Sequence, residues 1–338
     1  MKSTAVVILN WNGTKHLRRF LPSVIENTPV AVRIIVADNG STDDSVEVLR
    51  CEFPSVEIIC LDRNYGFAEG YNQALAQVDA EYCVLLNSDV ETPQCWLEPL
   101  VERLDADSRV AAVAPKLLWS EARNQFEYAG AAGGYIDYLG YPFCRGRIMK
   151  HTEYDDGQYD DAREVFWASG AAFCCRLQLF KELGGFDSHY FAHMEEIDLC
   201  WRMQLAGYRI EVEPRSRVYH YGGGTLATDS PNKVFLNHRN NLAMLYRCST
   251  PLQRCVVAVV RPLLDALAAV SYATKGNFRG AWAVARAYGD FIRWHRRLAT
   301  ERREIRTSAK VQKLPATVYR GSIVLRYLIG KKEFNKLM

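Results

Sequence analysis

Polar and acidic side chains suited to holding a phosphorylated ligand follow short apolar runs in the first 90 residues. In the most informative stretch, residues 82–89 (YCVLLNSD), an apolar run ends abruptly in Asn87-Ser88-Asp89. A buried parallel strand has this pattern, and in open α/β sheets the ligand lies just outside the carboxyl ends of the strands. A carboxylate at such a tip can hold a divalent cation against the phosphates of a ligand. Because Asn, Ser and Asp also form ordinary turns, the tip alone leaves both interpretations open.

Similar polar tips follow the other apolar runs of this region. They are Asn10-Trp11-Asn12-Gly13, Asp38-Asn39-Gly40-Ser41 and Asp62-Arg63-Asn64-Tyr65-Gly66. Tips that share one edge of a sheet form a polar crevice of the kind that binds a nucleotide. There Asp38 can accept hydrogen bonds from a base or ribose, and Asn39 and the turn at Gly66 can approach a base or phosphate closely. Caps and turns explain part of the same pattern, so the two interpretations overlap.

Two stretches further along the chain also carry groups that can do chemistry. Residues 193–202 (HMEEIDLCWR) place Glu195, Glu196 and Asp198 at the start of a helical pattern. Such crowded carboxylates repel one another unless a helix N-terminus, a cation or water relieves them, and simple capping is the alternative explanation. Residues 220–225 (HYGGGT) combine His220 with a glycine run, which suits a metal ligand or a phosphate contact.

The elements that must position these residues follow from the hydrophobic pattern. The first 115 residues alternate strand-like runs (5–9, 34–37, 56–61, 83–86 and 110–114) with helix-like segments (16–27, 43–50, 68–77 and 93–104). This alternation predicts an α/β fold with a parallel sheet covered on both faces. Pro93 suits the first turn of the fourth helix.

The second half of the chain is less regular. Residues 120–165 are rich in Gly, Tyr and acids and are predicted to form long loops with short strands, and helices are expected over 177–183 and 194–206. The chain lacks both GxGxxG and GxxxxGK[ST], so the dinucleotide-binding fingerprint and the P-loop are disfavoured.

The composition is that of a folded protein with room for one large or two ordinary domains. Of the 338 residues, 49% are apolar and 24% charged. Ten cysteines occur without a CxxC pair, which favours reduced thiols and a cytoplasmic location. The apolar run near the N-terminus is too short for a signal peptide and suits a buried strand.

Charge divides the chain near residue 250. Residues 251–338 hold 18 Lys and Arg against 5 Asp and Glu, a net charge of +13, and the whole chain carries +3, so the first 250 residues carry −10. The tail reads as helical, and its apolar stretch 255–274 is interrupted by Arg261, Pro262 and Asp265, which argues against a membrane-spanning helix. Either the tail lies on an anionic membrane surface, or it is a helical cap packed on the body.

Taken together, the quoted motifs resemble those of family 2 glycosyltransferases, and in particular their bacterial rhamnosyltransferase-like branch. The matching pieces are VVILNWNG, VADNGSTDDS, RNYGFAEGYNQA, LLNSDVE, GAAFCCR, GGFDSHYF, EEIDLCWRMQLAGY and HYGGGT, in the family's order across residues 4–225. The resemblance implies a GT-A fold, which is a Rossmann-like, mostly parallel sheet flanked by helices, here with a C-terminal helical basic extension. It implies inverting transfer of a sugar from a nucleotide-diphosphate donor, dTDP-rhamnose or a UDP-hexose, to a glycan or lipid-linked hydroxyl.

The resemblance also implies roles for individual residues. The donor site comprises Asn10, Asn12, Asp38, Asn39, Arg63, Asn64, Gly66, Asn87, Ser88 and Asp89. Asp89 and His220 would hold Mg2+ or Mn2+ at the donor diphosphate. Glu196 is the expected catalytic base, with Glu195 the second choice and Asp198 in support. Trp167, Ser169 and Gly170 occupy positions that contact donor sugar or acceptor.

Two positions depart from the family pattern. Asn87 replaces the first Asp of the DxD motif and is a weaker cation ligand, and Glu196 replaces an Asp and is one methylene longer. The neutral Asn87 leaves open a non-catalytic, membrane-associated nucleotide-sugar-binding protein. A sugar-phosphate nucleotidyltransferase is a third interpretation, although NWNGTKH lacks the Gly-rich loop with Arg or Lys that such enzymes carry.

The chain is thus predicted to contain a catalytic domain over 1–250 and a basic helical tail over 251–338. The catalytic domain would divide into a nucleotide-binding half (1–115) and an acceptor half (116–250). The expected location is cytoplasmic, with peripheral contact to the inner face of the cytoplasmic membrane as the open alternative. Nucleic acid is not an expected partner, because no base-reading motif accompanies the charge of the tail.

Overall fold

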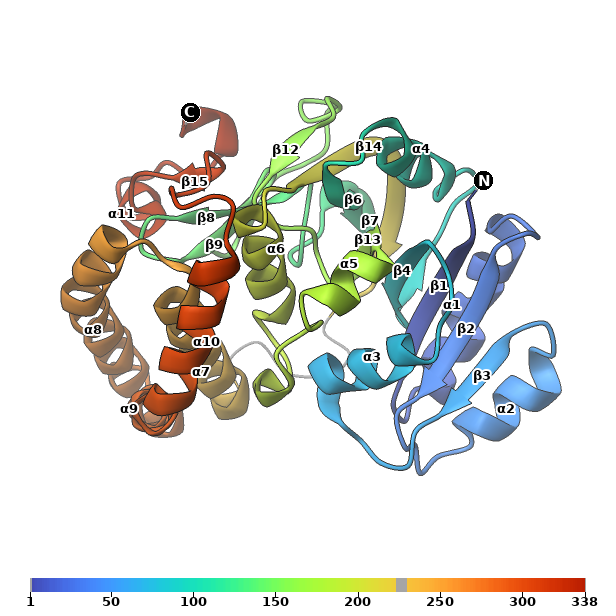
Figure 1. Ribbon diagram of the computed structural model, residues 1–338, viewed down its shortest axis with the longest axis horizontal. Helices are drawn as coiled ribbons and strands as arrows, with labels where there is room; N and C mark the ends of the chain where they lie inside the picture. The colour runs from blue at the N-terminus through green and yellow to red at the C-terminus, as the bar shows by residue number, and fades with distance from the viewer. Residues whose placement is uncertain (1, 223–229, 338) are drawn as a thin grey trace.

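The predicted strands form one half of a large sheet, and the predicted helices connect them (Figure 1). The computed structural model describes residues 2–222 and 230–337. Strands β1 (Thr4–Asn10), β2 (Arg33–Asp38), β3 (Glu57–Cys60) and β4 (Tyr82–Asn87) pair in parallel in the order β4-β1-β2-β3. Helices α1 (Thr14–Asn27), α2 (Ser45–Glu52) and α3 (Gly66–Ala76) follow the first three strands. The α/β prediction is confirmed here because each apolar run forms a strand whose side chains are shielded by helices.

The other half of the sheet is mixed. Strand β13 (Ala172–Arg176) lies between β4 and β6 (Val110–Trp119) and is antiparallel to both. Strand β14 (Arg209–His220) runs parallel to β6, and β12 (Arg163–Val165) closes that edge. The short strands β5 (Val90–Glu91) and β7 (Ala122–Phe126) pair with β14 and β6. Because β14 leaves the sheet at the same edge as β4, His220 returns to the tip that carries Asp89.

Short strands from the loop-rich region form a second sheet. Its order is β11 (His151–Thr152), β10 (Arg147–Ile148), β9 (Pro142–Cys144), β8 (Gly134–Asp137) and β15 (Val318–Tyr319). The last of these strands comes from the C-terminal tail, so residues far apart in the sequence complete one sheet.

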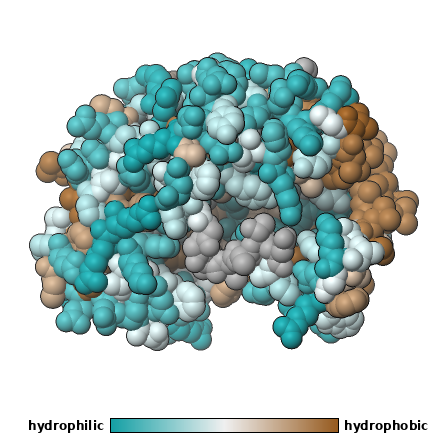
Figure 2. All heavy atoms as spheres, turned by 180° about the vertical axis from the view of Figure 1, so that it is seen from behind, coloured by the Kyte–Doolittle hydropathy of each residue, from teal (hydrophilic) through white to brown (hydrophobic). Residues whose placement is uncertain are grey.

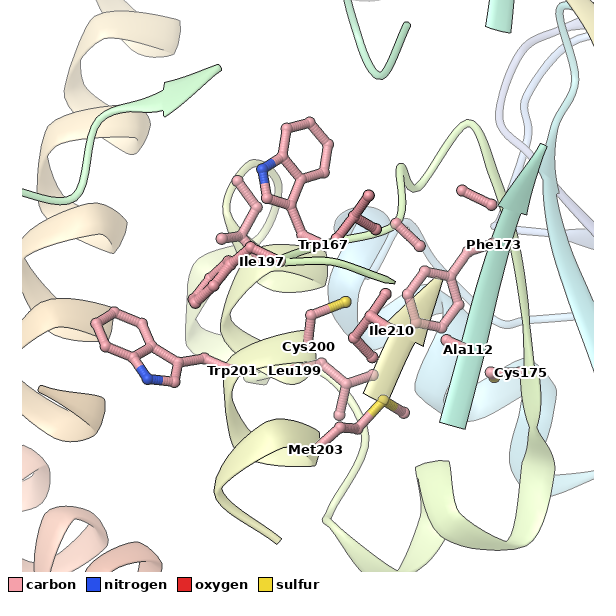
Figure 3. Packing of buried hydrophobic residues seen from close by; sticks show 14 of the residues in the cluster. Ala112, Trp167, Phe173, Cys175, Ile197, Leu199, Cys200, Trp201, Met203 and Ile210 are labelled. Carbon is pink, nitrogen blue, oxygen red and sulfur yellow. The ribbon is translucent and has the colours of Figure 1, made fainter. Parts of the chain in front are cut away.

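The remaining helices are divided between the two sides of the large sheet, with α4 on the side of α1 and the others on the side of α3 (Figure 1). They are α4 (Glu98–Ala106), α5 (Leu177–Glu182), η1 (Ser188–Tyr190), α6 (Glu195–Leu205), α7 (Pro231–Cys248), α8 (Pro251–Thr274), α9 (Phe278–Arg293), α10 (His295–Ser308), α11 (Ile323–Leu328) and η2 (Phe334–Lys336), of which α4 covers the sheet itself. Helix α6 lies between the sheet and the group α7–α10. Figure 3 shows Leu199 and Met203 of α6 toward Ile210 of the sheet, while Trp201 points to the opposite side. Packing on both sides fixes the helix that carries the acidic cluster.

One local prediction was wrong, and one helix has a feature that was not predicted. The fourth helix begins at Glu98 rather than at Pro93, since Pro99 provides the proline of its first turn. Helix α8 runs without interruption for 24 residues through Pro262. Its neighbour Arg261 donates hydrogen bonds to the Leu139 carbonyl and to Asn241, and these tertiary contacts offset the cost of an interior proline. Within the described residues, α8 is the one helix long and apolar enough, by length and composition, to cross a membrane.

Candidate active site

The polar tips meet at one edge of the large sheet. In the strand register Asn10 lies opposite Asp38, and Leu9 lies opposite Asn87. The carboxyl ends of β1, β2 and β4 therefore lie side by side at this edge, as the sequence pattern predicted.

Asp38 and Asn10 form the buried floor of this edge. One Asp38 oxygen accepts a hydrogen bond from Asn10 Nδ2 at 3.0 Å, and the other accepts from the Ser41 N–H at 2.9 Å. Asn10 is fully buried, and its Oδ1 has no hydrogen-bond partner. A buried carboxamide oxygen without a partner costs free energy, which a donor group on a ligand would recover.

Asn39 shapes the neighbouring loop. Its Nδ2 donates to the Gly66 carbonyl at 2.9 Å, and its Oδ1 accepts from the Tyr65 N–H at 3.0 Å. Asn64 also closes this turn, because its Oδ1 accepts from the Gly66 N–H at 2.8 Å. Arg63 is exposed and stacks over the Tyr65 ring. The turn interpretation thus holds for Asn39 and Asn64, and Arg63 is the side chain left free to meet a ligand.

Asn12 occupies the turn after β1. Its backbone has φ 49, and its side-chain oxygen accepts from the Thr42 N–H at 2.7 Å. Its own N–H donates to the Ser41 hydroxyl at 2.8 Å. Asn12 therefore joins two of the polar tips into one rigid rim.

Asp89 and His220 lie side by side at the tip of β4. His220 Nε2 is 3.1 Å from Asp89 Oδ1 and 3.4 Å from Asn87 Nδ2, and its Nδ1 is 3.3 Å from Glu127 Oε1. Burial disfavours the charged imidazole, but the carboxylates of Glu127 and Asp89 outweigh that effect and raise the pKa of His220 to about 10. Burial likewise opposes ionisation of Asp89, yet the His220 charge keeps the pKa of Asp89 below its usual value.

The donor set at this tip fits a cation that shares a site with phosphates. Mg2+ in nucleotide enzymes commonly takes one or two protein ligands and completes its shell with phosphate and water oxygens. Asp89 Oδ1 and His220 Nε2 are close enough to be two such ligands once His220 releases its proton. No third His, Cys, Asp or Glu converges on the same point within the described residues.

The second chemical centre is the carboxylate pair at the start of α6. Burial, together with the neighbouring Glu196, raises the pKa of Glu195 well above its usual range. Burial also raises the pKa of Glu196, to about 7, while the N–H groups of Glu196, Ile197 and Gly170 moderate the shift. The Oε2 atoms of both carboxyl groups are buried and have no hydrogen-bond partner. A carboxyl group that titrates near neutrality and has an unpartnered oxygen is suited to take a proton.

The segment before this pair is strained and tied down. Three of its non-glycine residues have positive φ, namely Phe191, His193 and Met194. Asn240 of α7 donates from Nδ2 to the carbonyls of Tyr190, Ala192 and His193 at 2.8–3.1 Å. Positive φ at such residues costs of order 1–3 kcal/mol each and persists only where the surroundings impose it. Asn240 is one of the groups that impose it here.

Asp198 anchors the same helix. It is fully buried, and its two oxygens accept hydrogen bonds from Arg202 at 2.8 Å and Arg247 at 2.6 Å. Arg247 also pairs with Asp187 at 2.8 Å and with Glu301 of α10 at 2.7 Å. With both oxygens paired to arginines, Asp198 fixes the position of α6, and its role in support of the predicted base stays a prediction.

Backbone contacts connect the two centres. The Asn87 N–H donates to the Ala171 carbonyl at 3.0 Å, and the adjacent Gly170 N–H faces the Glu196 carboxylate. The Phe191 carbonyl accepts from the N–H groups of Phe67 and Ala68, just after Gly66. A Cβ on Gly66 would come within 2.5 Å of the Phe191 ring, so glycine is required there. The predicted donor and base residues thus belong to one connected site.

Trp167 and Ser169 lie in the wall behind this connection. Trp167 is almost fully buried, packs on Gly134 and donates to the Tyr135 carbonyl at 2.9 Å. Ser169 accepts from the Ala171 N–H at 3.2 Å. Their predicted contact with sugar or acceptor stays a prediction, and their visible task is to hold the segment that includes Gly170.

The sequence analysis missed the residues that contact or position the predicted site residues. They are Glu127, Asn240 and Arg247, together with Asp187, which was quoted only within a motif. Asn240 and Arg247 lie on the buried face of α7, so polar residues on the apolar face of an amphipathic helix were the available signal. Glu127 follows β7 in the irregular region and offered none. The motif residues Gly223, Gly224 and Thr225 lie outside the described residues.

A mixed α/β sheet with a nucleotide-type edge, a cation-compatible tip and a nearby pair of buried carboxyl groups is the arrangement expected of a sugar transferase of the GT-A type. The model of the family "Glycosyl transferase family 2" matches residues 5–180, so the chain belongs to glycosyltransferase family 2. The predicted enzyme class is thereby confirmed, and a nucleotidyltransferase is excluded.

Curated relatives agree with this assignment. The chain is 26% identical over 257 residues to the N-acetylglucosaminyl-diphospho-decaprenol L-rhamnosyltransferase of Mycobacterium tuberculosis, which covers 71% of this chain and 83% of the relative. It is 29% identical over 168 residues to the rhamnosyltransferase WbbL of Escherichia coli, covering 46% of this chain and 61% of the relative. The predicted resemblance to the rhamnosyltransferase-like branch is confirmed.

Solved structures share the fold. GalNAc-T7 with UDP, GalNAc and Mn2+ superposes with a TM-score of 0.61 at 18% identity, over 78% of this chain and 51% of that one. TarS 1–349 of S. aureus gives a TM-score of 0.56 at 15% identity, over 90% of this chain and 87% of that one. A mannosyltransferase from Pyrobaculum calidifontis with GDP-Man and Mn2+ gives 0.52 at 16% identity, over 91% and 86%. The predicted GT-A architecture is confirmed.

Proposed function

We propose that this enzyme transfers a sugar, rhamnose from dTDP-rhamnose or a hexose from a UDP-hexose, to a hydroxyl of a glycan or lipid-linked acceptor in cell-surface polysaccharide synthesis. The observation that carries the proposal is the Glu195-Glu196 pair, whose unpartnered oxygens lie in one connected site with the polar sheet edge. The name of the M. tuberculosis relative supports rhamnose and a polyprenyl-diphosphate acceptor. Family membership supports the use of a nucleotide-sugar donor.

The mechanism we propose is a single displacement with inversion. The acceptor oxygen attacks the anomeric carbon from the face opposite the diphosphate. As the new C–O bond forms, the anomeric bond to the diphosphate oxygen breaks, and the electron pair leaves with the nucleoside diphosphate. Glu196 takes the proton of the acceptor hydroxyl, which suits a carboxyl group with a pKa of about 7. Glu195, whose pKa is higher still, stays protonated beside it.

The sheet edge would bind the donor. Asn10 and Asp38 would meet the nucleoside, Arg63 would approach the phosphates, and Asn87, Ser88 and Asp89 would face the diphosphate. Asp89 and His220 would hold Mg2+ or Mn2+, whose positive charge would stabilise the departing diphosphate. Two of the solved structures with this fold contain Mn2+, which supports a divalent cation here.

The same proposal includes the place where the enzyme works. A lipid-linked acceptor would bring it to the inner face of the cytoplasmic membrane, and we propose that it is a cytoplasmic protein that contacts that membrane peripherally. The basic tail, with its net charge of +13, supports contact with anionic lipids.

The donor and the cation are tested together. Thermal-shift screening of dTDP-, UDP- and GDP-sugars with and without Mn2+ should single out one donor, and the product of its transfer should show an inverted anomeric configuration by NMR. Stabilisation by none of the nucleotide sugars would contradict the proposal.

Asp89→Ala tests the cation site. This variant should lose transfer activity by about a hundredfold or more, because one preorganised electrostatic contact at a leaving group is worth that much. Its thermal unfolding should match wild type in the absence of ligand. Full turnover by the variant, or by wild type in excess chelator, would remove the cation from the mechanism.

A further inference from the structure

Helix α8 turns its apolar face away from the protein. A ridge of aliphatic side chains, spaced along one face, is 59–72% exposed and comprises Leu252, Val259, Leu263, Leu267 and Val270. Figure 2 shows hydrophobic side chains gathered along its right edge. Because this view is turned by 180° from that of Figure 1, its right edge corresponds to the left side of Figure 1, where α8 lies. A contiguous apolar ridge of this kind marks an interaction surface.

The opposite face of α8 is buried and includes polar side chains. Arg261 and Asp265 are 2% and 1% exposed. Arg261 Nη1 donates to the Leu139 carbonyl at 2.8 Å and to Asn241 at 2.5 Å, and Asp265 accepts from the Tyr288 hydroxyl at 2.8 Å. Because Val256, Val257 and Val260 also pack toward the core, apolar side chains lie on both the inner and the outer side of α8. Its polar contacts fix its rotation so that the ridge faces outward.

The apolar surface continues onto α9. Phe278 and Trp282 at the start of α9 are 71% and 68% exposed. With Arg279 and Arg286 they line a hollow of about 460 Å3 that also includes Pro231. Because Pro231 begins α7, the helix that carries Asn240, this surface adjoins an element that positions the catalytic segment.

The charges around the ridge are of one sign. Between residues 251 and 289 the sole acid is Asp265, which is buried, whereas Lys275, Arg279 and Arg286 are exposed cations. Exposed aliphatic and aromatic side chains beside unbalanced cations match the chemistry of an anionic phospholipid surface. A second copy of this chain fits less well, because a symmetric contact would place these cations against their equivalents.

We propose that the outer face of α8 and the start of α9 form a docking surface for an anionic phospholipid bilayer, with α8 lying parallel to the membrane plane. The inference deepens the proposed function, because it names the side of this transferase that meets a membrane-embedded acceptor. The buried Arg261 and Asp265 of α8 keep this helix packed against the protein. If α8 crossed the membrane, these two residues would lose their hydrogen bonds and their charges would enter the hydrocarbon layer.

The test uses the full chain and vesicle flotation. Wild type should float with vesicles of phosphatidylcholine mixed with phosphatidylglycerol. A ridge variant (Val259→Ser, Leu263→Ser and Leu267→Ser) should bind these vesicles at least about tenfold more weakly. Each methylene group that inserts into the membrane contributes to the free energy of binding, and the variant lacks these groups. A control variant carries Val30→Ser, at an exposed aliphatic position in the loop after α1, and should float like wild type.

A charge variant separates the two contributions. Lys275→Glu with Arg279→Glu should weaken binding to the anionic vesicles and leave the weaker binding to pure phosphatidylcholine unchanged. Equal flotation of wild type and ridge variant would overturn the proposal. So would a wild-type dimer that the ridge variant converts to monomer, or wild-type protein in membranes that resists alkaline carbonate extraction.

Donor binding keeps this inference distinguishable from the proposed function. The ridge variant should keep the thermal shift that the donor nucleotide sugar gives wild type, and also its turnover with a water-soluble acceptor. If wild type floats as expected but no nucleotide sugar stabilises it, the docking surface stands and the proposed reaction fails.

Discussion

Glu195 and Glu196 are neighbours in the sequence but differ in their surroundings. Burial raises the pKa of Glu196, but the N–H groups of Ile197 and Gly170 limit the rise to about 7. Deeper burial and the nearby charge of Glu196 raise the pKa of Glu195 further. At neutral pH Glu196 therefore supplies the basic form. We expect Glu196→Gln to lower kcat by about 10^2–10^4, as loss of a general base does. Glu195→Gln should have the smaller effect.

The measurement is steady-state turnover combined with the donor-induced thermal shift. Glu196→Gln should keep that shift, because the amide occupies the same volume as the carboxyl group. The reverse order of the two variants, with Glu195→Gln inactive and Glu196→Gln active, would transfer the role of base to Glu195.

The raised pKa of Glu196 also predicts how the rate depends on pH. The base acts only when deprotonated, so kcat/KM should rise with pH, about tenfold per unit below pH 7, and level off above it. A carboxyl group with its ordinary pKa of about 4.3 would instead give a flat profile from pH 5 to pH 8. Measuring kcat/KM across that interval decides between them, with nucleotide release followed at each pH.

At this scale the sequence indicated candidate reacting groups but not the residues that contact them. Asp89, His220 and Glu196 were proposed because each ends a strand or begins a helix within a family motif, and their roles stay predictions. Glu127 was not found, because its contact with His220 joins an irregular segment to the end of β14 and exists only in the folded chain. Asn87 departs from the family motif, and its Nδ2 lies 3.4 Å from His220 Nε2.

At the scale of elements, α7 controls the shape of the catalytic segment. The Asn240 side chain donates hydrogen bonds to three carbonyl groups of this segment. Without these hydrogen bonds the positive φ angles before Glu195 can relax. We expect Asn240→Ala to lower kcat about tenfold or more while the KM for the donor stays unchanged. Hydrogen exchange of residues 188–194 should accelerate in the variant.

Asn237→Ala is the matched control. Asn237 lies on the same helix, and its side chain donates to the Lys233 carbonyl one turn earlier. It should retain both the rate and the exchange pattern of wild type. Equal losses in both variants would show that α7 is merely destabilised and would contradict a positioning role for Asn240.

Local patterns predicted the elements where local forces decide them. The first four strands and their helices follow from apolar runs and helix signals that lie next to each other in the chain. The insertion of β13 between β4 and β6, and the pairing of β15 with β8, depend on contacts between distant segments and left no local pattern. Helix α8 shows the same limit, because Arg261, which interrupts its apolar stretch, has partners from elsewhere in the chain.

At the scale of the whole molecule, the basic tail is built into the body. Asp137 of β8 is fully buried and accepts from the Ile323 N–H at 2.9 Å. Phe334 is 2% exposed and lies 5.1 Å from Tyr135, ring centre to ring centre. Glu301 of α10 pairs with Arg247, which in turn holds the helix of the catalytic carboxylates. Charge therefore divides the chain more sharply than packing does.

The predicted division at residue 250 can now be tested by truncation. A chain ending at Thr250 would expose the core around Tyr135, leave Asp137 without its Ile323 contact and leave Arg247 without Glu301. We expect it to lose cooperative unfolding in urea and to bind a hydrophobic dye, because the losses of apolar burial and of buried polar contacts fall on the same core. Phe334→Ala in the full chain should cost about 3–5 kcal/mol of unfolding free energy through the same cluster. Cooperative unfolding of the truncated chain, with an unchanged midpoint and donor-induced shift, would establish residues 1–250 as an independent domain.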